Sequence, residues 1–161
     1  MNENALFIAE EEQLWDDVPP AEDEIRTEKY LIFITADLKF GVNAEYVVEI
    51  ITNHTITPLP MVPGFIRGII NLRGQILPVV DMRLRLGMEM QEECLVIVLS
   101  IEGTYIGILV DSVDQMVDIP IDSILPPPIQ NAQKMASGMC SLPDGSGTMM
   151  VLDCGQLLLH E

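Results

Sequence analysis

Short apolar runs, each about as long as a β-strand, recur along most of the chain. Many of them are nearly continuous in Val, Ile and Leu, which is the pattern of strands buried between layers. Turn-forming residues separate the runs, for example in Pro126–Pro128 and Asp144–Gly147. Many short strands of this kind favour a barrel or sandwich over alternating βαβ units, so we do not expect a parallel sheet. The predicted strands are Tyr30–Thr35, Lys39–Val42, Phe65–Asn71, Gln75–Val80, Leu95–Ser100, Tyr105–Val110, Gln115–Ile119, Lys134–Leu142 and Thr148–Asp153.

Two segments depart from the strand pattern. Asn43–Ile51 carries apolar residues at i, i+3, i+4 and i+7, which predicts one face of a helix that Asn43 would cap. The apolar residues of this face are Ala44, Val47, Val48 and Ile51. We expect a second, short helix over Asp81–Leu86, because Asp81 can cap its start and Gly87 can end it.

The first 28 residues read as an acidic tail. They contain ten of the 25 acidic residues and are interrupted by a Pro-Pro pair. We expect residues 1–28 to be a disordered N-terminal tail. An alternative is a short linear motif, because the apolar clusters Leu6–Ile8 and Leu14–Trp15, flanked by acids, could dock into a partner's groove.

Composition narrows the class of protein. A net charge of −17 repels nucleic acids and anionic lipid surfaces. No apolar run approaches the roughly 18 residues that span a bilayer, and the N-terminus does not resemble a secretory signal. Hydrophobic residues make up 48% of the chain, enough for a real core. Two half-size units would each be marginal, so they would have to share apolar surface. We therefore expect a cytoplasmic protein that neither binds nucleic acid nor inserts into the membrane.

The residues that usually carry catalysis are not arranged for it. Cys94, Cys140 and Cys154 are odd in number and form no CxxC pair, which fits reduced thiols in a cytosol. Cys94 and Cys154 adjoin apolar strands and are expected to be buried and inert. Neither His54 nor His160 lies in a nucleophile or zinc motif, and no calcium-loop spacing is present. We expect no enzymatic activity, no metal and no cofactor.

The segment Pro58–Gly87 concentrates positive charge. Its two predicted strands meet at Asn71–Gly74, a reverse turn that would place Arg73 on an exposed corner with a free guanidinium. The segment holds four of the seven basic residues that follow the tail, namely Arg67, Arg73, Arg83 and Arg85. They could form a patch that seeks carboxylates or other anions, or they could serve only surface solubility. Charge alone does not decide between these readings.

The same segment, ITPLPMVPGFIRGIINLRGQILPVVDMRLRLG, resembles the signature of CheW-type chemotaxis coupling proteins. The shared features are an LP, then P-x-F-I-x-G, NLRG and P-V-V-D with a following basic helix. Upstream, KFGV and VVEI are similar to the strand and V-x-E-I helix of that family. Downstream, CLVIVLSIEGTYIGILVDSVDQMVDIP resembles its second half. The resemblance covers about residues 29–155.

This resemblance implies an all-β fold with short helices, in which two five-stranded SH3-like β-barrels pack together within residues 29–161. It implies an adaptor that couples the cytoplasmic tips of methyl-accepting chemoreceptors to the regulatory domain of a CheA-type histidine kinase. Such a protein would be recruited to receptor arrays at the inner face of the membrane. The alternative within the family is a specialised scaffold of a non-flagellar chemosensory pathway, which the acidic tail favours.

The resemblance also assigns receptor-binding residues. They would be Val47, Glu49, Gly68, Arg73 and Leu95, with Leu95 lining a groove between the barrels. Structural alternatives exist for two of them, since Val47 lies on an apolar stripe and Gly68 could simply permit close strand approach. The turn in the C-terminal portion is looser than in the family, so the kinase-binding residues stay unassigned.

Overall fold

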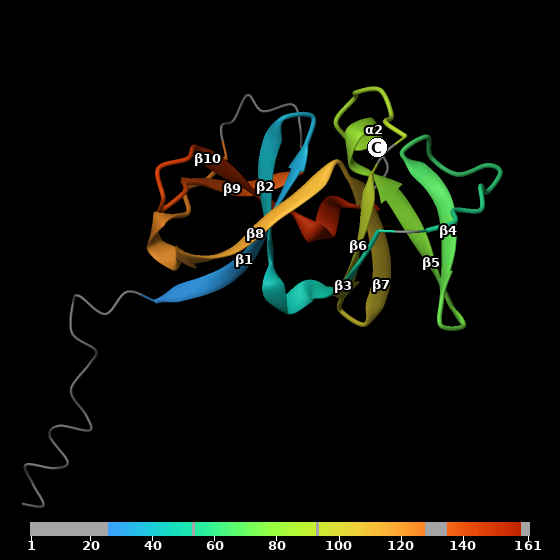
Figure 1. Ribbon diagram of the computed structural model, residues 1–161, viewed down its shortest axis with the longest axis horizontal. Helices are drawn as coiled ribbons and strands as arrows, with labels where there is room; N and C mark the ends of the chain where they lie inside the picture. The colour runs from blue at the N-terminus through green and yellow to red at the C-terminus, as the bar shows by residue number, and fades with distance from the viewer. Residues whose placement is uncertain (1–25, 53, 93, 128–134, 159–161) are drawn as a thin grey trace, which may run out of the picture.

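The computed structural model describes residues 26–52, 54–92, 94–127 and 135–158. Two five-stranded sheets, each curled into a small SH3-like barrel, lie side by side (Figure 1). The predicted fold class, all-β with short helices and two packed barrels, is confirmed. Of the expected tail, residues 1–25 lie outside the described residues, and residues 27 and 28 already belong to the first strand.

The chain forms two strands of one barrel, then all five strands of the other, and finally the remaining three strands of the first. Barrel 1 has the spatial order β8-β1-β2-β10-β9, and barrel 2 has the order β3-β6-β7-β5-β4. Barrel 1 comprises β1 (Thr27–Thr35), β2 (Leu38–Asn43), β8 (Ser112–Pro120), β9 (Ala136–Ser141) and β10 (Thr148–Leu152). Barrel 2 comprises β3 (Val47–Ile51), β4 (Ile66–Leu72), β5 (Gln75–Asp81), β6 (Leu95–Ile101) and β7 (Thr104–Val110). Each of the nine predicted runs overlaps one of these strands.

The predicted helix over Asn43–Ile51 is wrong. The segment forms one 3-10 turn, η1 (Ala44–Tyr46), and then strand β3, which pairs with β6. Its Val and Ile residues are β-branched and favour a strand once a partner strand is present. The capping role of Asn43 is confirmed, because its Oδ1 accepts a hydrogen bond from the backbone N of Glu45 at 3.0 Å.

The second predicted helix is confirmed as α2 (Met82–Arg85). The Asp81 carboxylate accepts hydrogen bonds from the backbone N of Arg83 and Leu84, and Gly87 follows with a φ of +80°. Neither sheet is a parallel sheet, as expected, but each contains one parallel pair. β5 pairs with β7 and β10 pairs with β2 in parallel, whereas the other pairs are antiparallel. Antiparallel ladders therefore predominate in both sheets.

The two barrels share one topology, which sequence analysis did not detect. Strands β3 to β7 correspond in order to β8, β9, β10, β1 and β2, and the spatial orders then coincide. The register agrees, since Val79 opposes Gly107 in barrel 2 and Val151 opposes Gly41 in barrel 1. GILVDSV (107–113) thereby aligns with GVNAEYV (41–47). The repeat is hard to see in the sequence because these two segments share only the Gly and the final Val.

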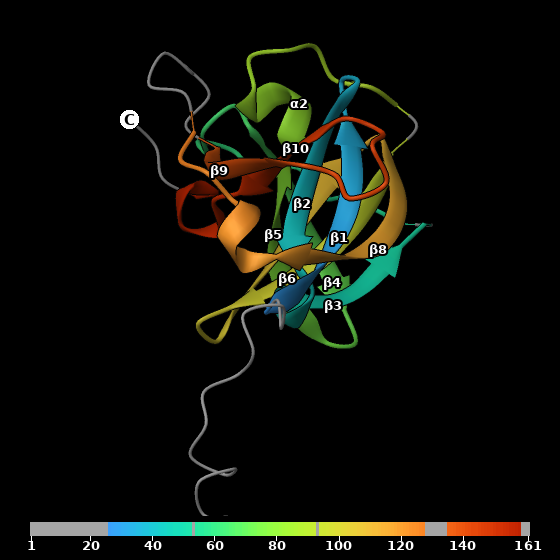
Figure 2. The ribbon, with the colours of Figure 1, turned by 90° about the vertical axis from the view of Figure 1, so that its left-hand side faces the viewer.

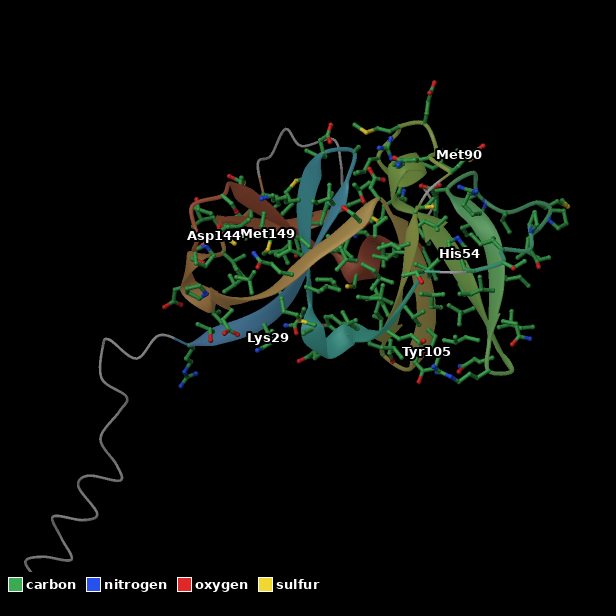
Figure 3. The ribbon with its side chains drawn as sticks, in the orientation of Figure 1. Lys29, His54, Met90, Tyr105, Asp144 and Met149 are labelled. Carbon is green, nitrogen blue, oxygen red and sulfur yellow. The ribbon has the colours of Figure 1, made fainter. Side chains whose placement is uncertain are left out.

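Three apolar clusters hold the fold together. One fills each barrel, and the largest lies between the two barrels. Strand β6 shows why both strand faces are apolar: Val96 and Val98 point into barrel 2, whereas Ile97 and Leu99 join the shared core. In barrel 1, the fully buried Met149 belongs to the inner cluster and lies within the left-hand barrel in Figure 3. The expectation that two small units share apolar surface is confirmed.

Candidate functional site

Two edge strands flank the boundary between the barrels. β3 is an edge of one sheet and β8 is an edge of the other. Both lie on the viewer's side in Figure 1, and both lie on the right-hand side in Figure 2, so they border the same side of the molecule. This side is where a partner could touch both barrels at once.

Apolar side chains are exposed on both edge strands. Ile50 is 39% exposed and opposes Ile97, while Met116 is 49% exposed and opposes Leu31. Ile97 and Leu31 belong to the shared core, and directly opposed residues project to the same face of a sheet. Ile50 and Met116 therefore sit on the sheet faces directed toward the barrel boundary. Each also occupies the position equivalent to the other in the repeated topology.

We call these residues and their neighbours the interbarrel surface. It consists of Val47, Val48, Ile50, Val113 and Met116. Val47 and Val113 are half-buried against the shared core, whereas Val48 is 44% exposed. Sequence analysis missed Ile50 and Met116. The signal that could have found them is an apolar residue placed on a strand next to acidic or amide residues, as in VVEI and VDQM.

Arg73 lies on the predicted corner, but its guanidinium is not free. Arg73 and Gly74, both with positive φ, form the two-residue turn between β4 and β5. The Arg73 side chain is 73% exposed, and its Nη2 lies 2.8 Å from Oε1 of Glu49. The prediction of a free guanidinium is therefore wrong. The ion pair joins the β4–β5 turn to β3 across the open side of barrel 2, whose edge strands are β3 and β4.

Gly68 has a clear packing role. A Cβ at this position would lie 2.1 Å from the carbonyl oxygen of Thr57, and the Gly68 φ is +145°. Thr57 and Ile69 exchange two backbone hydrogen bonds of 2.9 Å each, so the segment before β4 crosses directly over Gly68. Only a residue without a side chain permits this approach.

The five predicted receptor-binding residues all belong to barrel 2 but do not form one cluster. Val47 and Leu95 both pack against the shared core, from opposite ends of the paired strands β3 and β6. Glu49 and Arg73 pair at the closing edge of the barrel, and Gly68 lies under the crossing segment. Leu95 also borders a cavity of ≈ 520 Å³. The other lining residues of that cavity are Thr52, His54, Gln91, Glu92, Cys94 and Asp111.

The remaining arginines of the cationic segment are engaged within the protein. Arg67 Nη1 lies 2.9 Å from Oδ2 of the buried Asp81. Arg83 binds Asp111 in a bidentate manner, at 2.8 and 2.7 Å, and holds the pKa of that carboxyl below its ordinary value. Arg85 lies 4.3 Å over the ring of Phe65. These three arginines therefore stabilise the fold. Neither an anion-seeking patch nor surface solubility accounts for them, since both would require side chains directed at solvent.

Asp111 connects the barrels. It is the single residue between β7 of barrel 2 and β8 of barrel 1. Its carboxylate binds Arg83 of α2 and also accepts a hydrogen bond from the backbone N of Ala36 at 2.9 Å. Its own backbone N donates to the carbonyl of Ile34 at 2.9 Å. Three contacts thus fix the chain where it passes between the barrels.

The described thiols are held in their protonated form. Burial raises the pKa of Cys154 to about 11 and raises the pKa of Cys94 and Cys140 as well. Burial, followed by the charge of Arg67, lowers the pKa of His54, so its imidazole is neutral near pH 7. His160 lies outside the described residues.

The described part of the chain offers neither a metal site nor a membrane-spanning helix. It contains no group of three His, Cys, Asp or Glu side chains suited to a metal ion. None of its helices is long and apolar enough to cross a membrane.

Comparisons with known proteins agree with one another. The sequence profile of the CheW-like domain matches residues 29–161. The chemotaxis protein CheW of Klebsiella aerogenes is 30% identical over 140 residues, which cover 83% of each chain. Protein FrzA of Myxococcus xanthus is 33% identical over 110 residues, or 63% of this chain and 66% of FrzA. The crystal structure of the scaffolding protein TtCheW from Thermoanaerobacter tengcongensis superposes with a TM-score of 0.75 at 30% identity, covering 82% of this chain and 92% of TtCheW.

Proposed function

The chain belongs to the CheW-like domain family and is a chemotaxis scaffold, and we propose that it couples chemoreceptors to a CheA-type histidine kinase. In this role it binds the cytoplasmic tip of a methyl-accepting chemoreceptor and the regulatory domain of the kinase. It works in the cytoplasm, recruited to receptor arrays at the inner face of the membrane. It acts by holding its partners together and catalyses no reaction.

The observation that carries this proposal is the exposed apolar interbarrel surface. On a protein of net charge −17, a strip of exposed Val, Ile and Met side chains next to the shared core suits the apolar face of a partner helix. Met side chains adapt to a partner's shape because they are unbranched and flexible. Such a contact is modest in area, and repetition within an array raises its effective affinity.

We assign different roles to the predicted receptor-binding residues. Val47 contributes apolar contact beside Ile50, and Leu95 supports the same sheet face from the far end of β6. Arg73 is exposed and pairs with the half-buried Glu49, so a partner's charged side chain can reach Arg73 and exchange with that pair. Gly68 acts through the fold, by allowing the segment before β4 to cross.

The test is calorimetric titration of the full chain with a receptor-tip hairpin, comparing two matched variants. Ile50→Asp places a charge on the interbarrel surface. Met90→Asp places the same charge on an exposed apolar residue, 58% exposed, in the loop after α2 at the opposite end of barrel 2 (Figure 3). We expect Ile50→Asp to weaken binding at least about tenfold, the equivalent of 1.4 kcal/mol, and Met90→Asp to leave it unchanged.

Two outcomes would contradict the proposal. Equal affinities of Ile50→Asp and the unaltered protein would show that the receptor tip does not use this surface. Failure of the unaltered protein to bind both the receptor tip and the kinase regulatory domain would remove the coupling role. A circular dichroism melt of each variant checks that the fold is retained.

A further inference from the structure

A second cavity, distinct from the interbarrel surface, lies where the two barrels meet near η1. Its volume is ≈ 430 Å³, and residues of both barrels line it. Three carboxylates, from Glu28, Glu102 and Asp153, come from separate segments of the chain, and two phenols accompany them. None of its lining residues is Lys or Arg. The full lining is Glu28, Tyr30, Asn43, Tyr46, Ile101, Glu102, Ser137, Val151, Leu152, Asp153, Cys154 and Gly155.

The repeated topology shows what occupies the equivalent place in the other half of the molecule. Asp153 corresponds to Asp81, since Asp81 is the last residue of β5, Asp153 directly follows β10, and each caps the short helix that follows. The backbone N of Asp81 donates to the carbonyl of Phe65 at 2.8 Å, and that of Asp153 donates to the carbonyl of Met135 at 2.6 Å. The two sites therefore have the same backbone frame.

The side chains that fill this frame differ between the halves. Near Asp81, the guanidinium of Arg67 binds the carboxylate at 2.9 Å, and Arg83, two residues after Asp81, binds Asp111. The register places Ser137 at the position of Arg67 and Gly155 at the position of Arg83. Barrel 1 thus keeps the carboxylate but has small residues in place of both guanidinium side chains, and both small residues line the cavity.

The cavity carries more negative charge than its filled counterpart. Glu28 of barrel 1 occupies the position that Cys94 has in barrel 2. Glu102 of barrel 2 occupies the position that Ala36 has in barrel 1. The Glu28 carboxylate accepts a hydrogen bond from Asn43 at 2.8 Å, which holds it beside Tyr30. Carboxylates and phenol rings that line one cavity offer a guanidinium both charge-assisted hydrogen bonds and an aromatic face to stack on.

We propose that this cavity binds the guanidinium of an arginine side chain presented by a protein partner. The geometry favours arginine over lysine because a planar fork can bond two carboxylates at once and can stack on a phenol ring. Gly155, at the position of Arg83, has no side chain of its own. The arginine side chain must therefore come from a partner segment. The proposal is independent of the receptor contact assigned to the interbarrel surface.

The experiment is an NMR titration of the ¹⁵N-labelled full chain with N-acetyl-L-arginine amide. We expect the amide chemical shifts of Asn43, Glu102 and Gly155 to change and to saturate at millimolar ligand concentration. N-acetyl-L-lysine amide should bind at least about fivefold more weakly. Asp153→Asn keeps the acceptor that caps the short helix but removes the charge, and should weaken binding at least fivefold. Ile50→Asp should bind the arginine derivative like the unaltered protein, which separates this proposal from the receptor contact.

Gly155→Arg supplies the guanidinium from within. An added Cβ there meets only Oδ1 of Asp153, at 3.4 Å, so the backbone accepts a side chain. We expect Gly155→Arg to abolish binding of the arginine derivative and Gly155→Ala to retain it. The proposal is overturned if the cavity amides do not shift, if the lysine derivative binds equally, or if Asp153→Asn binds unchanged. Tighter binding of free L-arginine than of the blocked derivative would overturn the assignment to a protein partner.

Discussion

Replacing Gly68 by Ala should destabilise the protein through the backbone of a segment distant in sequence. The new Cβ would lie 2.1 Å from the Thr57 carbonyl oxygen, 2.7 Å from its carbon and 2.9 Å from Cα of Pro58. These are main-chain atoms, so no side-chain rotation can relieve the contact. The segment before β4 has to move away from the strand.

The cost has two parts. A non-glycine residue at a φ of +145° is strained by about 1–3 kcal/mol. Displacing Thr57 breaks its two hydrogen bonds with Ile69, each contributing about 1 kcal/mol. Together they lower the free energy of unfolding by about 3–5 kcal/mol. At roughly 3 °C for each kcal/mol in a domain of this size, the Tm should fall by about 10–15 °C.

The assay is thermal and urea unfolding of Gly68→Ala beside two matched glycine variants. Gly74→Ala has a φ of +85° but meets nothing within 4 Å, so it should cost only the strain. Gly138→Ala, the equivalent of Gly68 in barrel 1, meets Ile124 Cγ2 at 2.7 Å and the Leu125 carbonyl at 3.0 Å. We expect the greatest loss for Gly68→Ala. A Gly68→Ala protein as stable as Gly74→Ala would refute the reasoning, and a loss of receptor binding without loss of stability would assign Gly68 to the interface.

Three further predictions address single side chains. Arg73→Glu should lower the unfolding free energy by about 1 kcal/mol, because the Arg73 side of its ion pair with Glu49 is exposed, and the exchange Arg73→Glu/Glu49→Arg should restore that loss in urea unfolding. Cys154 should react with a thiol reagent at pH 8 about a hundredfold more slowly in the folded protein than in urea, because its folded pKa of about 11 leaves little thiolate; equal rates would show that it is exposed. Arg83 lowers the pKa of Asp111 in the folded protein below 3.8. The stability that this ion pair contributes is therefore present above pH 3.8 and is lost as the pH falls through the folded pKa. The difference in unfolding free energy between the unaltered protein and Asp111→Asn should therefore narrow in acid, and a constant difference would exclude the ion pair as its source.

Local chemistry made the strands and α2 predictable. Runs such as Leu95–Leu99 are apolar at every position because one face fills a barrel and the other fills the shared core. Asp81 and Gly87 are specific start and stop signals, and the structure uses both. The error at Asn43–Ile51 arose because the spacing of four aliphatic residues matches a helix, whereas pairing with β6 decides the outcome.

The details of the site depend on contacts between distant segments. The partner of Arg73 is Glu49, and the two meet only when barrel 2 closes. Met116 was placed correctly on a strand, but its exposure follows from the position of β8 at a sheet edge. The correspondence of Gly155 with Arg83 is invisible in the sequence, because the helices that carry these residues share no motif beyond the preceding Asp.

The order of the strands has a consequence for synthesis on the ribosome. Barrel 2 is a continuous stretch of chain, so it can form as soon as β7 has emerged, whereas barrel 1 needs β8, β9 and β10 to complete β1 and β2. Roughly 40 residues separate these events, or about 2–8 s of translation. During that interval the half of the shared core on barrel 2 faces water, and β1 and β2 have no further strands to pair with. Newly made chains should therefore be most prone to aggregation, and most dependent on chaperones, between the emergence of β7 and that of β10.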